Sequence, residues 1–208
     1  MITRRDFLIA GALLPLPAAA QAPFGVVREL TGSVTLNDFP LVRNSALQAG
    51  QTIRTGADGR VWFSIGGDAY FLRPNSTMRL DASKPSEPFI DFLRLVTGAL
   101  GATFARGMQR TLIAPTATIG IRGTGVYLEA TPDWTYFCTC FGSTEILTAP
   151  SGNMMESVAV STENHQARVI HREAMSGTRI VRAGFERHTN EEIAQLESLV
   201  GRPNPFRS

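Results

Sequence analysis

The stretch ADGRVWFSIGGDAYFL, residues 57–72, decides the fold class. It opens on Asp58-Gly59, a dipeptide that favours a tight turn between strands. Residues 60–65 then alternate with period two, which places Val61, Phe63 and Ile65 on one face of a strand. Gly66-Gly67-Asp68 turns the chain again, and residues 69–72 return. The pattern predicts short strands joined by tight turns.

The same rhythm continues outward along most of the chain, which contains 19 glycines and 12 prolines. Other strand-like runs occupy residues 26–30, 33–36, 89–95 and 157–161. The sequence shows no heptad, long amphipathic helix or alternating strand–helix rhythm before its C-terminal part, so it predicts an all-β protein. Residues 81–88 read as a surface loop. Residues 101–112 lack a clear pattern, and we expect a mobile connection or an irregular edge there.

Residues 113–129, IAPTATIGIRGTGVYLE, form the most patterned segment. Two strands are predicted to meet at a bend that has a glycine on either side of Thr124. Glycines at a bend permit a positive φ or a close backbone approach. We therefore expect a structural role for Gly120 and Gly123, and we expect the Thr124 side chain to satisfy backbone groups at the bend.

The order of the motifs between residues 26 and 147 resembles that of a FecR domain. The first two motifs are a Leu-x-Gly-x-Val opening at 30–34 and a Gly-x-x-Ile-x-Thr-Gly unit at 50–56. After an alternating strand come Leu-Arg-Pro-Asn-Ser at 72–76, a strand with Gly98, and Thr-Ala-Thr-Ile-Gly-Ile-Arg-Gly-Thr at 116–124. The resemblance implies a short-strand sandwich or a β-helix-like roll. It also implies a non-enzymatic, periplasmic sensing or interaction role, and it supplies no active site to transfer.

The best-known FecR-type proteins are membrane-spanning regulators of sigma factors that carry a cytoplasmic helical segment. This sequence shows neither a cytoplasmic helical segment nor a membrane helix. The expectation is therefore a free-standing periplasmic domain rather than a direct sigma-factor regulator.

Residues 1–22 are predicted to be a twin-arginine export signal. Arg4 and Arg5 head a short apolar run, and Ala20 and Ala22 supply the small side chains of a signal-peptidase site. The twin-arginine route carries proteins that are already folded. We expect cleavage after Ala22 and a periplasmic mature protein without a membrane span.

Removing residues 1–22 leaves 18 basic and 17 acidic side chains, a net charge of +1, since the 20 and 18 of the whole chain lose Arg4, Arg5 and Asp6. A nucleic-acid partner would need a clustered basic face, so none is expected. The sequence has no nucleophile elbow, phosphate loop, dinucleotide fingerprint or His-Glu-x-x-His motif. We therefore expect a non-enzymatic protein whose partner is a periplasmic or envelope protein.

Residues 134–142, WTYFCTCFG, are aromatic and β-branched and predict a strand. Alternation places Trp134, Tyr136, Cys138 and Cys140 on one face, with Phe137 and Phe141 on the other. The two thiols should therefore face the same way.

Three interpretations of Cys138 and Cys140 remain open. A disulfide or redox pair suits an oxidising compartment, but Cβ atoms at i and i+2 on a strand lie about 6.5–7 Å apart, against about 3.8 Å in a disulfide. The thiols could instead be inert and buried. In a metal site for zinc, copper or iron, His165 and His171 are the candidate further ligands. Because six strand residues span roughly 20 Å, both histidines can serve one ion only if the chain bends between them.

The C-terminal part is predicted to add a hairpin and a helix. Residues 23–150 would form the FecR-like β domain and residues 151–188 a β-hairpin extension. Thr189 and Glu192 form a capping-box pattern, and the apolar side chains that follow at helical spacing predict a helix over 189–201.

Overall fold

The computed structural model describes residues 25–82, 90–150 and 155–206, and the predicted export signal, with Arg4, Arg5, Ala20 and Ala22, lies outside them. The described part of the protein is all-β with one short C-terminal helix, as the sequence predicts. The helix, α1, comprises Asn190–Leu199. The strands of the described residues are β1 (Gly25–Thr31), β2 (Val34–Leu36), β3 (Phe39–Pro40), β4 (Ala46–Leu47), β5 (Thr52–Thr55), β6 (Arg60–Ile65), β7 (Asp68–Leu72), β8 (Thr77–Asp81), β9 (Phe92–Thr103), β10 (Gln109–Ala114), β11 (Ala117–Ala130), β12 (Trp134–Thr148), β13 (Ser157–Thr162), β14 (Gln166–Met175) and β15 (Thr178–Ala183).

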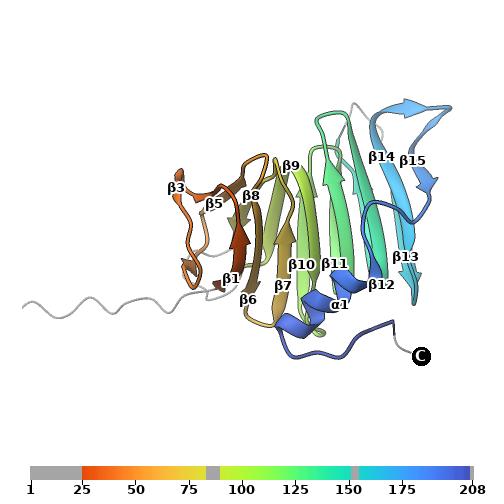
Figure 1. Cartoon of the computed structure of the whole chain (residues 1–208). Coiled ribbons are helices and arrows are strands. Elements are labelled where there is room, and N and C mark those ends of the chain that lie inside the picture. Colours follow the sequence, from red (N-terminus) through yellow and green to blue (C-terminus); the bar gives the residue numbers. More distant parts are fainter. Residues whose placement is uncertain (1–24, 83–89, 151–154, 207–208) are drawn as a thin grey trace, which may run out of the picture.

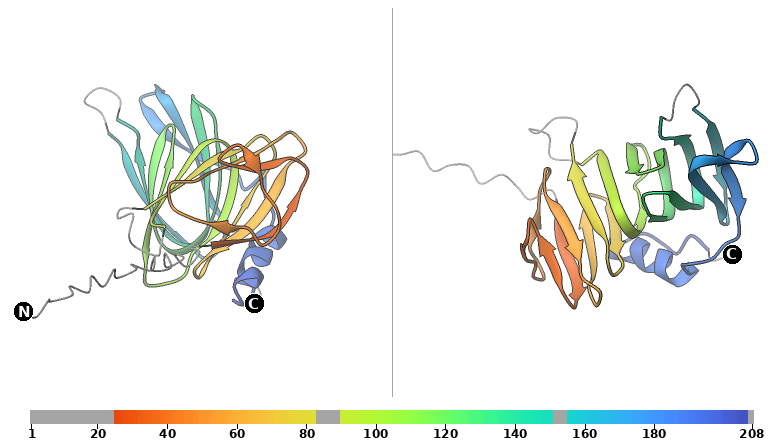
Figure 2. Two further views of the ribbon diagram at one scale, coloured as in Figure 1. Left: turned by 90° about the vertical axis from the view of Figure 1, so that its left-hand side faces the viewer. Right: turned by 90° about the horizontal axis from the view of Figure 1, so that it is seen from above.

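The strands form one branched sheet that folds over on itself into an open roll (Figures 1 and 2). Three long strands, β9, β11 and β12, run through both halves of the roll. The C-terminal parts of β9 and β11 and the N-terminal part of β12 pair within the first half, which also contains β1, β4, β6, β7, β14 and β15. Their other parts pair within the half that contains β2, β3, β5, β8, β10 and β13.

Each long strand contains a glycine with positive φ where it passes from one half to the other. These are Gly98 in β9 (φ 91°), Gly123 in β11 (φ 58°) and Gly142 in β12 (φ 86°). At Gly123, a Cβ atom would lie 3.0 Å from the Arg106 Cα. The bend predicted around Thr124 is therefore one of three at which the sheet folds over on itself.

Two apolar clusters lie on opposite sides of the first half. The inner cluster fills the roll and includes Val61, Phe63 and Ile65, as the alternation predicts. The outer cluster lies between the sheet and α1, and its helix members are Ile193 and Leu196. Figure 2 shows α1 along the outside of the roll when the molecule is seen from above.

The expectation for residues 101–112 is wrong in part. Gly101–Thr103 complete β9, and β10 begins at Gln109. β10 pairs with β11 in antiparallel and with β9 in parallel orientation. A parallel neighbour is not connected through a tight turn, so no local signal marks the pairing. Only the residues between β9 and β10 remain irregular.

The prediction of a short C-terminal helix is confirmed. β14 and β15 form the hairpin, and β13 and β14 both pair with β12, so the sheet continues past residue 150. Thr189 caps α1: its hydroxyl oxygen accepts a hydrogen bond from the Glu192 N–H, and its own backbone N–H donates to the Glu192 carboxylate. Among the described residues, no helix has the length and apolar character to cross a membrane.

Candidate metal centre

β12 places both cysteines on the outer face of the sheet. Cys138 and Cys140 are fully buried in the outer cluster together with Tyr136, while Phe137 points into the roll. Phe141 lies outside and not inside, contrary to the alternation. The reason is a β-bulge: Gly125 pairs with Phe141 and the next residue with Thr139, so Cys140 is an extra residue that breaks the period of two.

The two sulfurs form a compact cluster with two imidazoles. One ligand atom each from Cys138, Cys140, His165 and His188 lies within 4.8 Å of the other three. The Cys138 Sγ is 3.5 Å from the His165 Nδ1, and the Cys140 Sγ is 3.3 Å from the His188 Nε2. Zinc–sulfur and zinc–nitrogen bonds at a tetrahedral angle would place S and N about 3.6 Å apart. The cluster therefore has nearly the spacing of a tetrahedral site.

Three separate segments supply these four residues. His165 directly precedes β14, and its backbone N–H donates to the Cys140 carbonyl oxygen at 3.0 Å. His188 lies between β15 and α1, directly before the helix cap. The cluster therefore exists only when β12, β14 and the C-terminal segment have assembled.

Hydrogen bonds turn each imidazole so that its free nitrogen faces a sulfur. The His188 Nδ1 donates to the Glu186 carbonyl oxygen at 3.0 Å, which leaves the Nε2 lone pair for Cys140. The His165 Nε2 donates to the Asn190 Oδ1 at 2.6 Å, which leaves the Nδ1 lone pair for Cys138. Metal-binding histidines usually have such a partner on the second nitrogen, because it fixes the tautomer and the ring orientation.

The two thiols hold their protons very differently. The hydrogen bond from Cys140, against the opposing effect of burial and with further help from His165 and His188, lowers the pKa of Cys138 to about 4. Burial, followed by the hydrogen bond and the charge of Cys138, raises the pKa of Cys140 well above its usual value. Of the two thiols, Cys138 is therefore the one that gives up its proton at the lower pH.

Aromatic rings cover the cluster. Phe185 stacks on the His165 ring at a centroid distance of 3.7 Å, and Phe206 stacks on it at 5.0 Å. Tyr127 stacks on His188 at 4.5 Å, and His188 is only 6% exposed. Such a shell excludes water and strengthens the interaction of the donor atoms with a cation.

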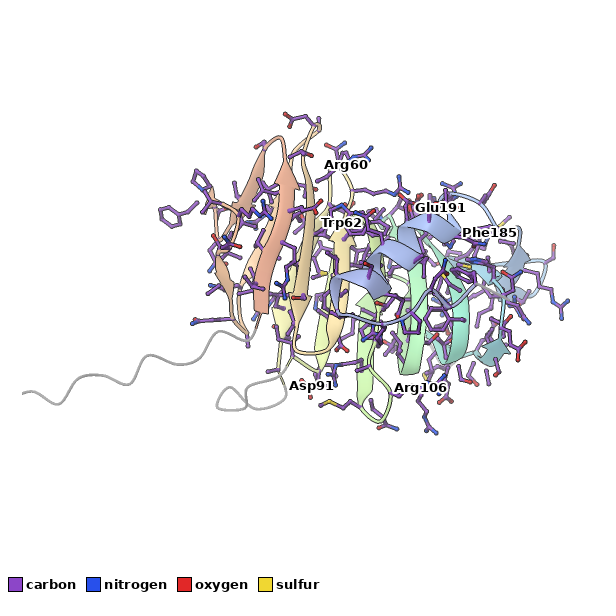
Figure 3. The ribbon with its side chains drawn as sticks, turned by 60° about the horizontal axis from the view of Figure 1, so that its bottom comes forward. Arg60, Trp62, Asp91, Arg106, Phe185 and Glu191 are labelled. Carbon is purple, nitrogen blue, oxygen red and sulfur yellow. The ribbon has the colours of Figure 1, made fainter. Side chains whose placement is uncertain are left out.

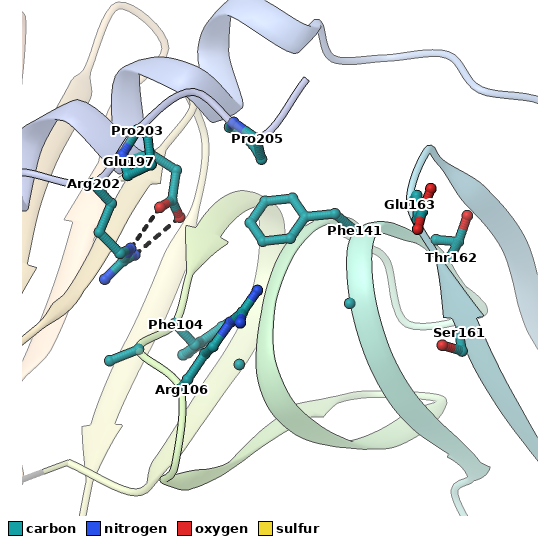
Figure 4. A pocket seen from close by; sticks show the side chains of 13 residues that line it. Phe104, Arg106, Phe141, Ser161, Thr162, Glu163, Glu197, Arg202, Pro203 and Pro205 are labelled. Atoms are coloured by element: carbon teal, nitrogen blue, oxygen red, sulfur yellow. Dashed lines mark hydrogen bonds and ion pairs between the residues drawn. The ribbon is translucent and has the colours of Figure 1, made fainter. Parts of the chain in front are cut away.

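A groove with a volume of about 990 Å³ lies beside this shell (Figure 4). Phe141 lines this groove, and its ring packs edge-on against the Phe206 ring at a centroid distance of 6.1 Å. Arg106 and Arg202 also line the groove, and Arg202 forms an ion pair with Glu197 at 2.5 Å. None of the four cluster residues lines the groove.

The structure brings Cys138, Cys140 and His165 together and places His171 elsewhere. His171 lies in β14 opposite Trp134, outside the cluster, because β14 runs on without a bend that would return it to His165. His188 takes the remaining place, and the sequence reasoning missed it. The available signal was the count: the chain has three histidines, and His188 adjoins the predicted helix cap. Both cysteines are free thiols.

Of the three residues expected to have a structural role, Gly123 and Thr124 lie at the bend of β11. The Thr124 hydroxyl donates to the Phe141 carbonyl oxygen and lies 3.3 Å from the Gly125 carbonyl oxygen, so the side chain does satisfy backbone groups there. Gly123 has the positive φ expected of a bend. Gly120 differs: it pairs within β11, and its nearest atom would lie 3.9 Å from an added Cβ, so its surroundings do not require glycine.

No protein-family model and no curated protein sequence matches the chain. Two crystal structures of a protein designated a "putative anti-sigma factor" from Parabacteroides distasonis ATCC 8503, at 1.65 and 2.50 Å resolution, are similar to it with TM-scores of 0.49 at 11% sequence identity. Each match covers 64% of this chain and 59% of the other, so the chain spans less than two thirds of the length of those structures.

Proposed function

We propose that this chain is an exported, non-enzymatic metal-binding protein in which Cys138, Cys140, His165 and His188 hold one zinc ion. The observation that carries the proposal is the convergence of four donor atoms within 4.8 Å. Convergence alone also occurs in buried polar clusters. Here, however, each imidazole has its second nitrogen bonded to an oxygen, so that both remaining lone pairs face sulfur.

The donor set suits zinc best. Two sulfurs and two imidazole nitrogens in a tetrahedral arrangement are typical of structural zinc, and copper(I) and iron are the other metals that such donors favour. Four protein ligands leave no coordination position for a substrate or an activated water molecule. The site therefore fits a structural or regulatory ion and supports the non-enzymatic assignment.

The ion would serve an interaction or sensing module in the periplasm, because the FecR-like motifs and the metal site contact the same helix. Arg73, in the Leu-Arg-Pro-Asn-Ser motif, forms an ion pair with Glu192 of α1 at 2.7 Å. The motif region and the metal cluster are thus both connected to the C-terminal helix. Because the cluster exists only in the folded chain, an export route for folded proteins would allow the ion to bind before export.

Metal analysis of the purified protein tests this proposal. The protein and three variants, Cys138→Ser, His188→Ala and His171→Ala, are loaded with zinc, freed of excess metal and measured by elemental analysis. We expect one zinc ion per chain in the parent protein and in His171→Ala, which removes a histidine outside the cluster. We expect substoichiometric zinc in the other two.

Thiol labelling separates the metal site from the alternatives. Zinc should protect both cysteines from an alkylating reagent, and a chelator should restore labelling without a reductant. A parent protein that retains no zinc and labels only after reduction would contradict the proposal and support the disulfide interpretation.

A further inference from the structure

The C-terminal strap, which we define as residues 184–206, crosses the outer face of the roll (Figures 1 and 3). It leaves β15, passes the metal cluster at His188, forms α1 and returns to the cluster, where Phe206 stacks on His165. It touches the sheet at widely separated points. The Tyr136 hydroxyl donates to the Gly184 carbonyl oxygen at 2.9 Å near its start, and the Arg202 guanidinium donates to the Thr103 hydroxyl at 2.9 Å near its end.

The strap covers an aromatic surface. The outer cluster beneath it includes Phe71, Tyr127 and Tyr136. Two apolar side chains of α1, Ile193 and Leu196, are fully buried against this surface. A ten-residue helix is marginal by itself in water, so α1 depends on this docking.

The metal cluster is fastened to the strap at two points. His188 belongs to the strap and is the one cluster residue that the strap supplies. The second connection is indirect, because the His165 ring is hydrogen-bonded to Asn190 in the first turn of α1. The other three ligands belong to the β-sheet side, so a strap that opened would leave a site with three ligands.

We propose that metal binding and closure of the C-terminal strap are coupled, so that the ion holds the strap over the aromatic surface and loss of the ion loosens it. The inference rests on the proposed function and concerns the regulation of the same site. The fourth ligand is present only when the strap is closed, so the ion binds the closed state more tightly than the open state. By reciprocity, closure raises metal affinity by the same factor as the metal stabilises closure.

Hydrogen exchange measures the first half of the coupling. The full chain is compared with saturating zinc and with a chelator, and exchange is followed in peptides from the strap and from β2 and β5, which pair in the other half of the roll and bury Val34 and Ile53 in the inner cluster. We expect amides of residues 184–200 to exchange at least tenfold more slowly with zinc, and those of β2 and β5 to change little. If the protein binds zinc but the strap exchanges at the same rate with zinc and with the chelator, the inference is overturned.

The second half is tested by loosening the strap at a residue that is not a ligand. Leu196→Ala removes a buried docking side chain, and Glu192→Gln weakens the ion pair with Arg73 while keeping a capping side chain. The control Asp38→Asn removes an ion pair with Arg54 in the β2–β3 region, and asparagine tolerates the positive φ of residue 38.

Zinc affinity is measured by competition with a chromophoric chelator. We expect the dissociation constant to rise at least tenfold in Leu196→Ala, two- to fivefold in Glu192→Gln, and not at all in Asp38→Asn. If Leu196→Ala does not fold, the Glu192→Gln result decides. Unchanged affinity in a variant whose strap exchanges faster would overturn the coupling and leave the metal site standing. If the parent protein binds no zinc, the proposed function itself fails.

Discussion

Gly142→Ala should destabilise the protein by about 2–5 kcal/mol, because two separate penalties meet at this bend. Gly142 has φ 86°, a left-handed conformation that costs a residue with a Cβ about 1–2 kcal/mol. An added Cβ would also lie 2.7 Å from the Thr124 Cβ and 2.8 Å from the Gly123 carbonyl oxygen. Relief of such crowding in a packed region costs about 1–3 kcal/mol more.

Gly50→Ala is the matched control for the crowding. Gly50 has nearly the same φ, 83°, but no atom lies within 4 Å of its added Cβ. Its substitution should cost only the conformational part, about 1–2 kcal/mol. Both substitutions reduce the freedom of the unfolded chain in the same way, so that contribution cancels in the comparison.

Thermal unfolding of the parent protein and the two variants in chelator, followed by circular dichroism, gives the difference. At about 2–4 °C per kcal/mol for a chain of this size, the thermal midpoint should fall by about 4–20 °C in Gly142→Ala and by about 2–8 °C in Gly50→Ala. Equal losses in the two variants would refute the claim that close packing at the bend stabilises the roll.

Three further predictions concern other parts of the molecule. Because the pKa of Cys138 is lowered from 9.0 to about 4, the metal-free protein should show thiolate absorbance between these pH values, and Cys138→Ser should lack it. Over the same pH range the thiol is protonated in the unfolded chain and ionised in the folded one, so the free energy of unfolding relative to Cys138→Ser should rise with pH and be lost as the pH falls through about 4. Asp68→Asn leaves the buried Arg110, 2.8 Å away and 6% exposed, without its counter-charge and should cost about 3–5 kcal/mol in urea unfolding, part of which Asp68→Asn/Arg110→Met should restore. Thr189→Ala removes the helix cap and should cost about 0.5–2 kcal/mol of local stability, seen as faster amide exchange in the first turn of α1 and not in the sheet.

The parts of the fold that could be predicted are those encoded by neighbouring residues. Alternation in residues 60–65 gave β6 and its inner face, and the Thr189–Glu192 pattern gave the start of α1. The parallel pairing of β10 with β9 joins residues about twenty positions apart along the chain without a turn to mark it. The passage of the three long strands from one half of the roll to the other could not be predicted either, because a local pattern shows where a strand runs and not which half of a roll it enters.

The candidate site divides in the same way. Period-two alternation placed Cys138 and Cys140 on a common face, because they lie on one strand. It gave the wrong face for Phe141, because a bulge depends on the pairing with β11. His188 comes within 3.3 Å of Cys140 although 48 residues separate them, and only tertiary structure brings it there.

The contacts of the imidazoles favour a shared ion over a bond between the sulfurs. Both cysteines are free thiols, and their sulfurs lie 3.5 Å and 3.3 Å from imidazole nitrogens, close to the roughly 3.6 Å between sulfur and nitrogen on one tetrahedral zinc ion. A disulfide would leave His165 and His188 without a partner for the nitrogens that the Asn190 and Glu186 oxygens turn toward sulfur. Two residues outside the cluster thus hold the imidazoles in the orientation that a metal ion needs. A structural disulfide makes no use of that orientation, and this difference is why the imidazole contacts, more than the cysteine pair, carry the metal assignment.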